Sequence, residues 1–254
     1  MEKLSTSQLS PLSPTRWPAD AFSARRCLVF VAGVGVAFAL GLVCASIAVL
    51  LGGPAPIRSG KNLQLTGGLL LAQIVAYVPL LAAALPLLPY TARRTLREIG
   101  LHAPTFSDAR AGALGTIAMY VFAEAAALLQ KFALHVEGTQ QAVRLFGTTH
   151  DRTLIYGLII LAVFIAPVVE ELIFRGFVFN ALLRYVNVGL AAVVSGMIFG
   201  LAHFDATAFF PLACGGVVLA LVYYRTGSLT ASMLTHGGFN AVNVALVLIT
   251  GGKG

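Results

Sequence analysis

Residues Leu28–Leu51 read LVFVAGVGVAFALGLVCASIAVLL, a run without a single charged side chain. As an α-helix rising 1.5 Å per residue, these residues are about 36 Å long, enough to cross the hydrocarbon core of a bilayer. The run is too long for the apolar part of a signal peptide, and it stops at two glycines and a proline, which end helices. We therefore expect a transmembrane helix here.

Six further apolar runs follow, so the fold class is an all-α polytopic transmembrane bundle of about seven spans, within a range of six to eight. Of the 254 residues, 58% are hydrophobic and 11% are charged, against about 25% charged residues in a soluble domain. Residues 1–27 are expected to form a disordered basic tail and residues 28–252 one transmembrane domain. The further helices are expected at about 67–88, 111–129, 154–183, 188–203, 211–224 and 229–249.

The net charge of +7 is explained by membrane topology. Lys and Arg residues lie between the apolar runs and form no continuous basic stripe, so no nucleic-acid partner is expected. The tail and alternate loops carry the excess of positive charge, which places the amino terminus in the cytoplasm of a multi-pass protein, in the plasma membrane if the chain is prokaryotic. Cys27, Cys44 and Cys214 form no CxxC pair and suggest neither a disulfide framework nor a structural zinc site.

Several ionisable side chains interrupt the apolar runs. An ionised residue at mid-bilayer costs at least ~2.5 kcal/mol on insertion scales, so such residues persist mainly in functional sites or in pairs. Glu170 lies in the fourth run. Three pairs of residues in this run and later runs are each spaced four positions apart, which is about one helical turn. The spaced pairs are Glu171 with Arg175, Phe199 with His203, and His236 with Asn240. Glu124, in the third run, has no such partner in the sequence and is expected to be an inward-facing, hydrogen-bonded carboxylate outside the site.

Three motifs in the last hundred residues resemble one known family. EELIFR (Glu170–Arg175), FGLAH (Phe199–His203) and HGGFN (His236–Asn240) are similar to the EExxxR, FxxxH and HxxxN motifs of the CPBP intramembrane proteases. That family includes the CAAX-prenyl endopeptidases of the Rce1 type and the bacterial abortive-infection proteins. The resemblance implies a protease core at about 153–250 and an endopeptidase that cleaves a membrane-associated protein or peptide, as in CAAX processing.

The chemistry of these side chains suits amide hydrolysis, which needs a base for water and a donor for the developing oxyanion. Glu170 and His203 are the expected water activators. His236 and Asn240 share a face and are the expected oxyanion donors. The supporting residues are expected to be Glu171, Arg175 and Phe199.

Metal use has two interpretations in the family that the chain resembles, a metalloprotease and a metal-free glutamate mechanism. Glu170, His203 and His236 are the three residues that could bind zinc, but the HExxH spacing is absent, so no cofactor is favoured and zinc remains the alternative. Two other functions compete with proteolysis: a proton-coupled transporter, against which no inverted repeat is visible, and a catalytically silent bacteriocin-immunity or binding protein.

Overall fold

The computed structural model describes residues 17–51, 58–59, 62–63, 66–136 and 151–250. Six of its helical segments are long and apolar enough to cross a membrane, and a shorter apolar helix joins them, which confirms the predicted bundle of about seven spans. A two-residue antiparallel strand pair adds a small hairpin. In chain order the elements are α1 (Ala24–Leu51), β1 (Arg58–Ser59), β2 (Asn62–Leu63), α2 (Gly67–Ala92), α3 (Phe106–Leu134), α5 (Arg152–Ile160), η3 (Leu161–Ile165), α6 (Ala166–Glu171), η4 (Leu172–Phe179), α7 (Asn180–Leu183), α8 (Val188–Leu201), α9 (Phe209–Thr226) and α10 (Leu229–Thr250).

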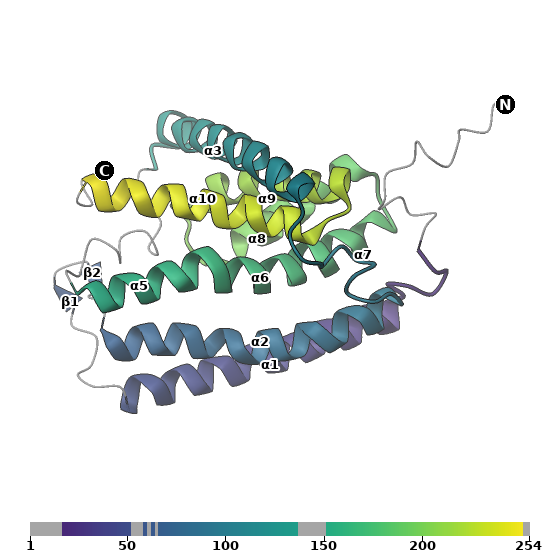
Figure 1. Cartoon of the computed structure of the whole chain (residues 1–254), viewed down its shortest axis with the longest axis horizontal. Coiled ribbons are helices and arrows are strands. Elements are labelled where there is room, and N and C mark those ends of the chain that lie inside the picture. The colour runs from purple at the N-terminus through teal and green to yellow at the C-terminus, as the bar shows by residue number, and fades with distance from the viewer. Residues whose placement is uncertain (1–16, 52–57, 60–61, 64–65, 137–150, 251–254) are drawn as a thin grey trace.

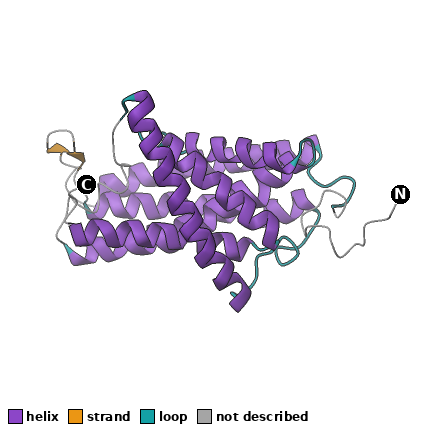
Figure 2. Cartoon of the chain, turned by 90° about the horizontal axis from the view of Figure 1, so that it is seen from above, coloured by secondary structure: helices purple, strands orange, loops and turns teal. Residues whose placement is uncertain are grey.

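The long helices lie side by side in three tiers (Figure 1). α1 and α2 pack together on one side, and α3, α8, α9 and α10 lie on the other. The continuous helical segment from α5 to α7, which is the predicted fourth span, lies between these two groups and contacts both. Figure 2 shows the same bundle after a quarter turn, with the small hairpin at one end of the helices. The central position of this span brings its polar side chains within reach of both groups.

Local capping explains where several helices begin. The Thr66 side chain accepts a hydrogen bond from the Leu69 amide at the start of α2. Thr105 and Asp108 form a reciprocal capping box at the start of α3, five residues before the start predicted from hydrophobicity alone. Hydrophobicity locates the apolar part of a helix, whereas the cap decides its first residue.

The end of the predicted tail is packed against the bundle. Phe22 is only 1% exposed and meets the Trp17 ring edge-on at 5.1 Å. The Arg184 guanidinium donates hydrogen bonds to the carbonyls of Ala19 and Ala21, at 2.6 and 2.7 Å. The structure therefore differs from the predicted disorder over residues 17–27, because two aromatic rings and a basic clamp tie this segment down. The rest of that prediction, residues 1–16, lies outside the described residues.

The fourth span contains two π-helical segments, η3 and η4, on either side of α6, which contains Pro167. The Ala166 amide bonds back to the Leu161 carbonyl, five residues earlier. Pro167 has no amide hydrogen, so it cannot continue this pattern by bonding to the Ala162 carbonyl. The widened turn accommodates the proline within a continuous helix, and it leaves a carbonyl available to a neighbouring helix.

Several close helix contacts depend on glycine, as two positions show. A Cβ built on Gly216 of α9 would lie 2.8 Å from the Gly196 Cα of α8. A Cβ on Gly237 of α10 would lie 2.6 Å from the Val163 carbonyl oxygen in η3. Real side chains do not tolerate such distances, so these glycines allow α8, α9 and α10 to approach their neighbours.

Glu124 does not face inward as expected. Its side chain is exposed on the outer face of α3. Gly115, whose missing side chain makes room for Thr235 of α10, lies nine residues earlier, which is half a turn away around an α-helix. Since α3 packs through its glycine face, Glu124 points away from the bundle and away from the site.

Candidate active site

Glu170, His203 and His236 converge from three separate helical segments. Glu170 lies near the end of α6, His203 lies two residues after the end of α8, and His236 lies in the first half of α10. The Nε2 atoms of both histidines lie 3.8 Å from the same Glu170 oxygen, Oε2. The Glu170 side chain is 15% exposed and the His203 side chain is 20% exposed. The structure therefore brings these three side chains together, with some access to the outside.

Both imidazole rings are oriented through their Nδ1 atoms. His203 Nδ1 lies 2.8 Å from the Phe199 carbonyl oxygen, and His236 Nδ1 lies 2.9 Å from the Glu171 carboxylate. A carbonyl or carboxylate oxygen can only accept, so Nδ1 is the donor in each ring. In the neutral state each ring therefore has its unprotonated nitrogen, Nε2, directed towards Glu170.

The fully buried Glu171 carboxylate is a structural hub of the site. It accepts hydrogen bonds from Arg175 at 3.0 Å, from His236 at 2.9 Å and from the Ser232 hydroxyl at 2.6 Å. Arg175, also fully buried, donates a further hydrogen bond to the Gly216 carbonyl of α9. These bonds join the fourth span to α9 and α10, so the pair fixes helix positions and also orients the His236 ring.

Phe199 packs between the polar groups. Its ring centroid lies 4.7 Å from that of His203 and 5.6 Å from that of His236, both in edge-to-face arrangements. The Arg175 guanidinium lies 4.6 Å from the ring centroid, within the range of cation–π attraction. A fully buried aromatic ring thus separates the buried ion pair from His203.

Asn240 lies one helical turn beyond His236 and has a different partner from the other motif residues. Its side-chain amide donates to the Ala162 carbonyl at 2.8 Å. This is the carbonyl that Pro167 leaves without an intrahelical donor. One amide hydrogen of Asn240 is therefore engaged in joining α10 to η3, and the second remains for another acceptor.

Tyr77 of α2 is a contact that the sequence did not suggest. Its hydroxyl donates a hydrogen bond to Glu170 Oε1 at 2.9 Å, and the two residues are 93 positions apart. A tyrosine within an apolar helix is most simply interpreted as packing, and no motif surrounds it. Only the three-dimensional arrangement reveals this contact.

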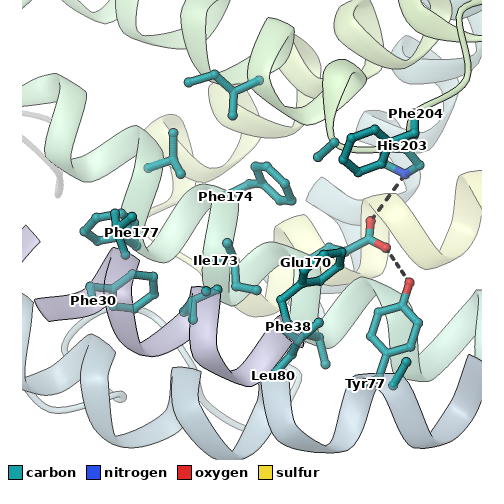
Figure 3. A pocket seen from close by; sticks show the side chains of 18 of the residues that line it. Phe30, Phe38, Tyr77, Leu80, Glu170, Ile173, Phe174, Phe177, His203 and Phe204 are labelled. Atoms are coloured by element: carbon teal, nitrogen blue, oxygen red, sulfur yellow. Dashed lines mark hydrogen bonds and ion pairs between the residues drawn. The ribbon is translucent and has the colours of Figure 1, made fainter. Parts of the chain in front are cut away.

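An apolar cavity of about 680 Å³ adjoins the cluster (Figure 3). Its polar lining consists of Gln73, Tyr77, Glu170 and His203. Phe174 and Phe177 line the cavity as well, whereas Phe179 and Phe199 lie in the core. The wall on the side of α1 is formed by Phe30, Val31, Val34, Gly35, Phe38 and Leu42. If the apolar part of a ligand occupied this cavity, a polar bond next to that part would lie close to Glu170.

Zinc binding at this cluster would need some rearrangement. Ligand atoms on a tetrahedral zinc ion, with bonds of 2.0–2.1 Å, lie about 3.3 Å apart, whereas Glu170 Oε2 is 3.8 Å from each Nε2. Among the described residues, no group of three or more His, Cys, Asp or Glu side chains has the geometry to hold a metal ion. Glu170 Oε2 and the Nε2 atoms of His203 and His236 still face one another, and atoms of these types bind zinc, so a metal can be tested directly.

The fold and the site define a polytopic membrane protein with a glutamate–histidine cluster beside an apolar cavity. Residues 152–242 match the family model described as type II CAAX prenyl endopeptidase Rce1-like. This part of the chain is therefore similar to the Rce1-like family, which confirms the CPBP resemblance of the three motifs.

Two curated relatives share a segment of similar length. An uncharacterized protein of Mycoplasma capricolum is 34% identical over 94 residues, which cover 35% of this chain and 27% of the relative. The Bacillus subtilis protein named "Putative membrane peptidase YdiL" is 31% identical over 91 residues, covering 36% of this chain and 37% of the relative. The chain thus spans between a quarter and two fifths of the length of these relatives. No solved structure matches it.

Proposed function

We propose that this chain is an intramembrane endopeptidase that hydrolyses a peptide bond in a membrane-associated protein or peptide through a water activated by Glu170 and His203. The observation that carries this proposal is the position of Glu170 Oε2, 3.8 Å from both Nε2 atoms at the wall of an apolar cavity. This distance is too long for a direct hydrogen bond and leaves room for a bridging water.

The water would donate one hydrogen bond to Glu170 and the other to His203 Nε2. Its oxygen lone pair then points to a substrate carbonyl in the cavity. As the oxygen attacks the carbonyl carbon, Glu170 takes the proton and later delivers it to the leaving amine. No metal ion is required for these steps, so a metal-free mechanism is favoured.

The oxyanion would be stabilised by Asn240 and His236. Asn240 has one amide hydrogen left after its bond to Ala162. His236 can donate from Nε2 only as an imidazolium, because Nδ1 already donates to Glu171. An imidazolium there would lie between the carboxylates of Glu170 and Glu171.

The substrate would carry an apolar portion next to the cleaved bond, because the cavity beside Glu170 is lined mainly by aliphatic and aromatic side chains. A lipid-modified carboxyl-terminal tail, as in CAAX processing, and an unmodified apolar membrane peptide both have this chemistry.

We further propose that the amino terminus is cytoplasmic, as the distribution of basic residues predicts.

Quantitative peptidomics of membranes tests the proposal. The wild-type chain is compared with Glu170→Gln, which preserves side-chain size and removes the base. We expect new carboxyl termini in wild-type membranes and their loss in the variant. Glu124→Gln is the matched control, because Glu124 is also a glutamate in a membrane-spanning helix but lies outside the site.

The control separates loss of the base from loss of the protein. Both variants should insert and accumulate like wild type, and Glu124→Gln should retain all the new termini. Cleavage that persists in Glu170→Gln membranes would contradict the assignment of Glu170 and the protease proposal with it.

A further inference from the structure

The two oxygens of the Glu170 carboxylate have different surroundings. Oε2 lies 3.8 Å from the two histidine Nε2 atoms, where the proposed water would bind. Oε1 accepts the hydrogen bond from the Tyr77 hydroxyl at 2.9 Å. In Figure 3 Tyr77 and His203 approach the carboxylate from different sides. One oxygen is therefore held while the other faces the reaction site.

The Tyr77 hydroxyl is the feature that sets the plane of this carboxylate. The terminal torsion of a glutamate is broad and roughly two-fold, so packing alone does not fix it. Within the described part of the chain, the Tyr77 hydroxyl is the one hydrogen-bond donor recorded for Glu170. Without this bond the carboxylate can rotate about its last torsion and direct Oε2 away from His203.

The ring of Tyr77 is itself held in place. It packs against the buried cluster of Leu70, Leu158, Leu161 and Val244, which joins α2 to the fourth span and α10. The hydroxyl therefore projects from a ring of fixed position towards the cavity. Replacing tyrosine with phenylalanine removes the donor and preserves this packing.

We propose that Tyr77 is a positioning residue for the general base, and that α2, which lies outside the segment matched to the family, thereby contributes to the active site. This inference rests on the proposed protease function. A hydrogen bond to a charged group contributes about 1.5–3 kcal/mol, so its loss should lower kcat by roughly 10- to 150-fold. KM should stay close to the wild-type value, because the apolar wall of the cavity is unchanged.

The first measurement uses membrane peptidomics on wild type, Glu170→Gln, Tyr77→Phe and Tyr156→Phe. Carboxyl termini that disappear in Glu170→Gln form the reference set. We expect Tyr77→Phe to reduce the rate at which this set appears, and Tyr156→Phe to leave it unchanged. Tyr156 is the matched control, since its side chain is exposed on α5 and lies outside the cavity lining.

The second measurement separates positioning from packing. A quenched fluorescent peptide, copied from the most abundant cleavage site in the reference set, is reconstituted in liposomes with each variant. Tyr77→Phe should lower kcat alone, whereas Tyr77→Leu, which also removes the ring, should in addition raise KM.

The outcomes are distinguishable. If no carboxyl termini disappear in Glu170→Gln membranes, the protease proposal is wrong, and this inference, which rests on it, is wrong as well. If such termini exist but appear at the wild-type rate in Tyr77→Phe membranes, the protease proposal stands and the role of Tyr77 is refuted. A Tyr77→Phe variant that changes KM and leaves kcat at the wild-type value refutes that role as well.

Discussion

Replacing Glu171 with glutamine removes a fully buried negative charge and retains the shape of the side chain. The glutamine oxygen can still accept from Arg175 and His236, and its amide can donate to the Ser232 hydroxyl. Ser232 keeps its own bond to the Leu219 carbonyl at 3.3 Å. The principal loss is therefore electrostatic, because Arg175 becomes a buried cation without its anionic partner.

The size of this effect follows from the burial of both groups, each of which is 0% exposed. Breaking a buried ion pair by removing one partner costs about 3–5 kcal/mol. At about 2–4 °C per kcal/mol for a chain of this length, Tm should fall by roughly 6–20 °C. The double variant Glu171→Gln, Arg175→Met should recover most of this loss, because it removes the unpaired charge as well.

Thermal unfolding of the purified protein in detergent measures these shifts. The control is Glu98→Gln, which breaks a pair with Arg94 of the same i,i+4 spacing at the surface. Hydrogen bonds from the Thr95 amide and hydroxyl, together with the nearby Arg94, hold the pKa of Glu98 below its ordinary value, so this glutamate is also ionised at neutral pH. Its loss should shift Tm far less, because water solvates the remaining arginine.

Two results would refute this reasoning. Wild-type stability in Glu171→Gln would mean that the pair is not a buried ion pair. A double variant no more stable than the single variant would mean that Arg175 is not the source of the loss.

Three further predictions concern the surroundings of the site. Asn240→Ala should destabilise the protein by about 1–3 kcal/mol by leaving a carbonyl without its donor, and this loss should shrink in a Pro167→Ala background, where the helix regains an amide hydrogen. Equal losses in the two backgrounds, compared by thermal unfolding, would contradict the proline explanation. Gly237→Ala should cost about 1–3 kcal/mol because its Cβ would overlap the Val163 carbonyl, whereas Gly67→Ala, with nothing within 4 Å of its Cβ, should be neutral by the same assay. Dialysis against a strong zinc chelator should leave peptide cleavage unchanged, and a loss of activity that added zinc restores would assign the cluster to a metal.

Much of the fold follows from hydrophobic patterning. Apolar runs such as Leu28–Leu51 are longer than the apolar stretches of helices in soluble proteins, and helix-breaking residues such as Pro54 mark where the runs end. The observed helices agree with these runs to within a few residues. The positions that differ depend on capping, as at Thr105, or on contacts distant in sequence, as where Arg184 clamps the segment before α1.

The candidate site was only partly accessible to sequence reasoning. Motif spacing identifies Glu170, His203 and His236 as candidates, because an ionisable residue in an apolar helix indicates an unusual environment. Tyr77 carries no such signal, since an aromatic residue is ordinary in a transmembrane helix. Ser232 is equally inconspicuous, although its hydroxyl binds the Glu171 carboxylate.

The π-helical turn at Leu161–Ile165 has a consequence for chain length. A wide turn of this kind accommodates an additional residue, and each residue of an α-helix advances the side chains by about 100°. Deleting one residue here should therefore convert the turn to an ordinary α-helix and leave the preceding helix in nearly the same orientation relative to the two glutamates. A deletion within the regular helix of α5 has no widened turn to absorb it, so it should rotate the residues before it by about 100° and be tolerated far less well.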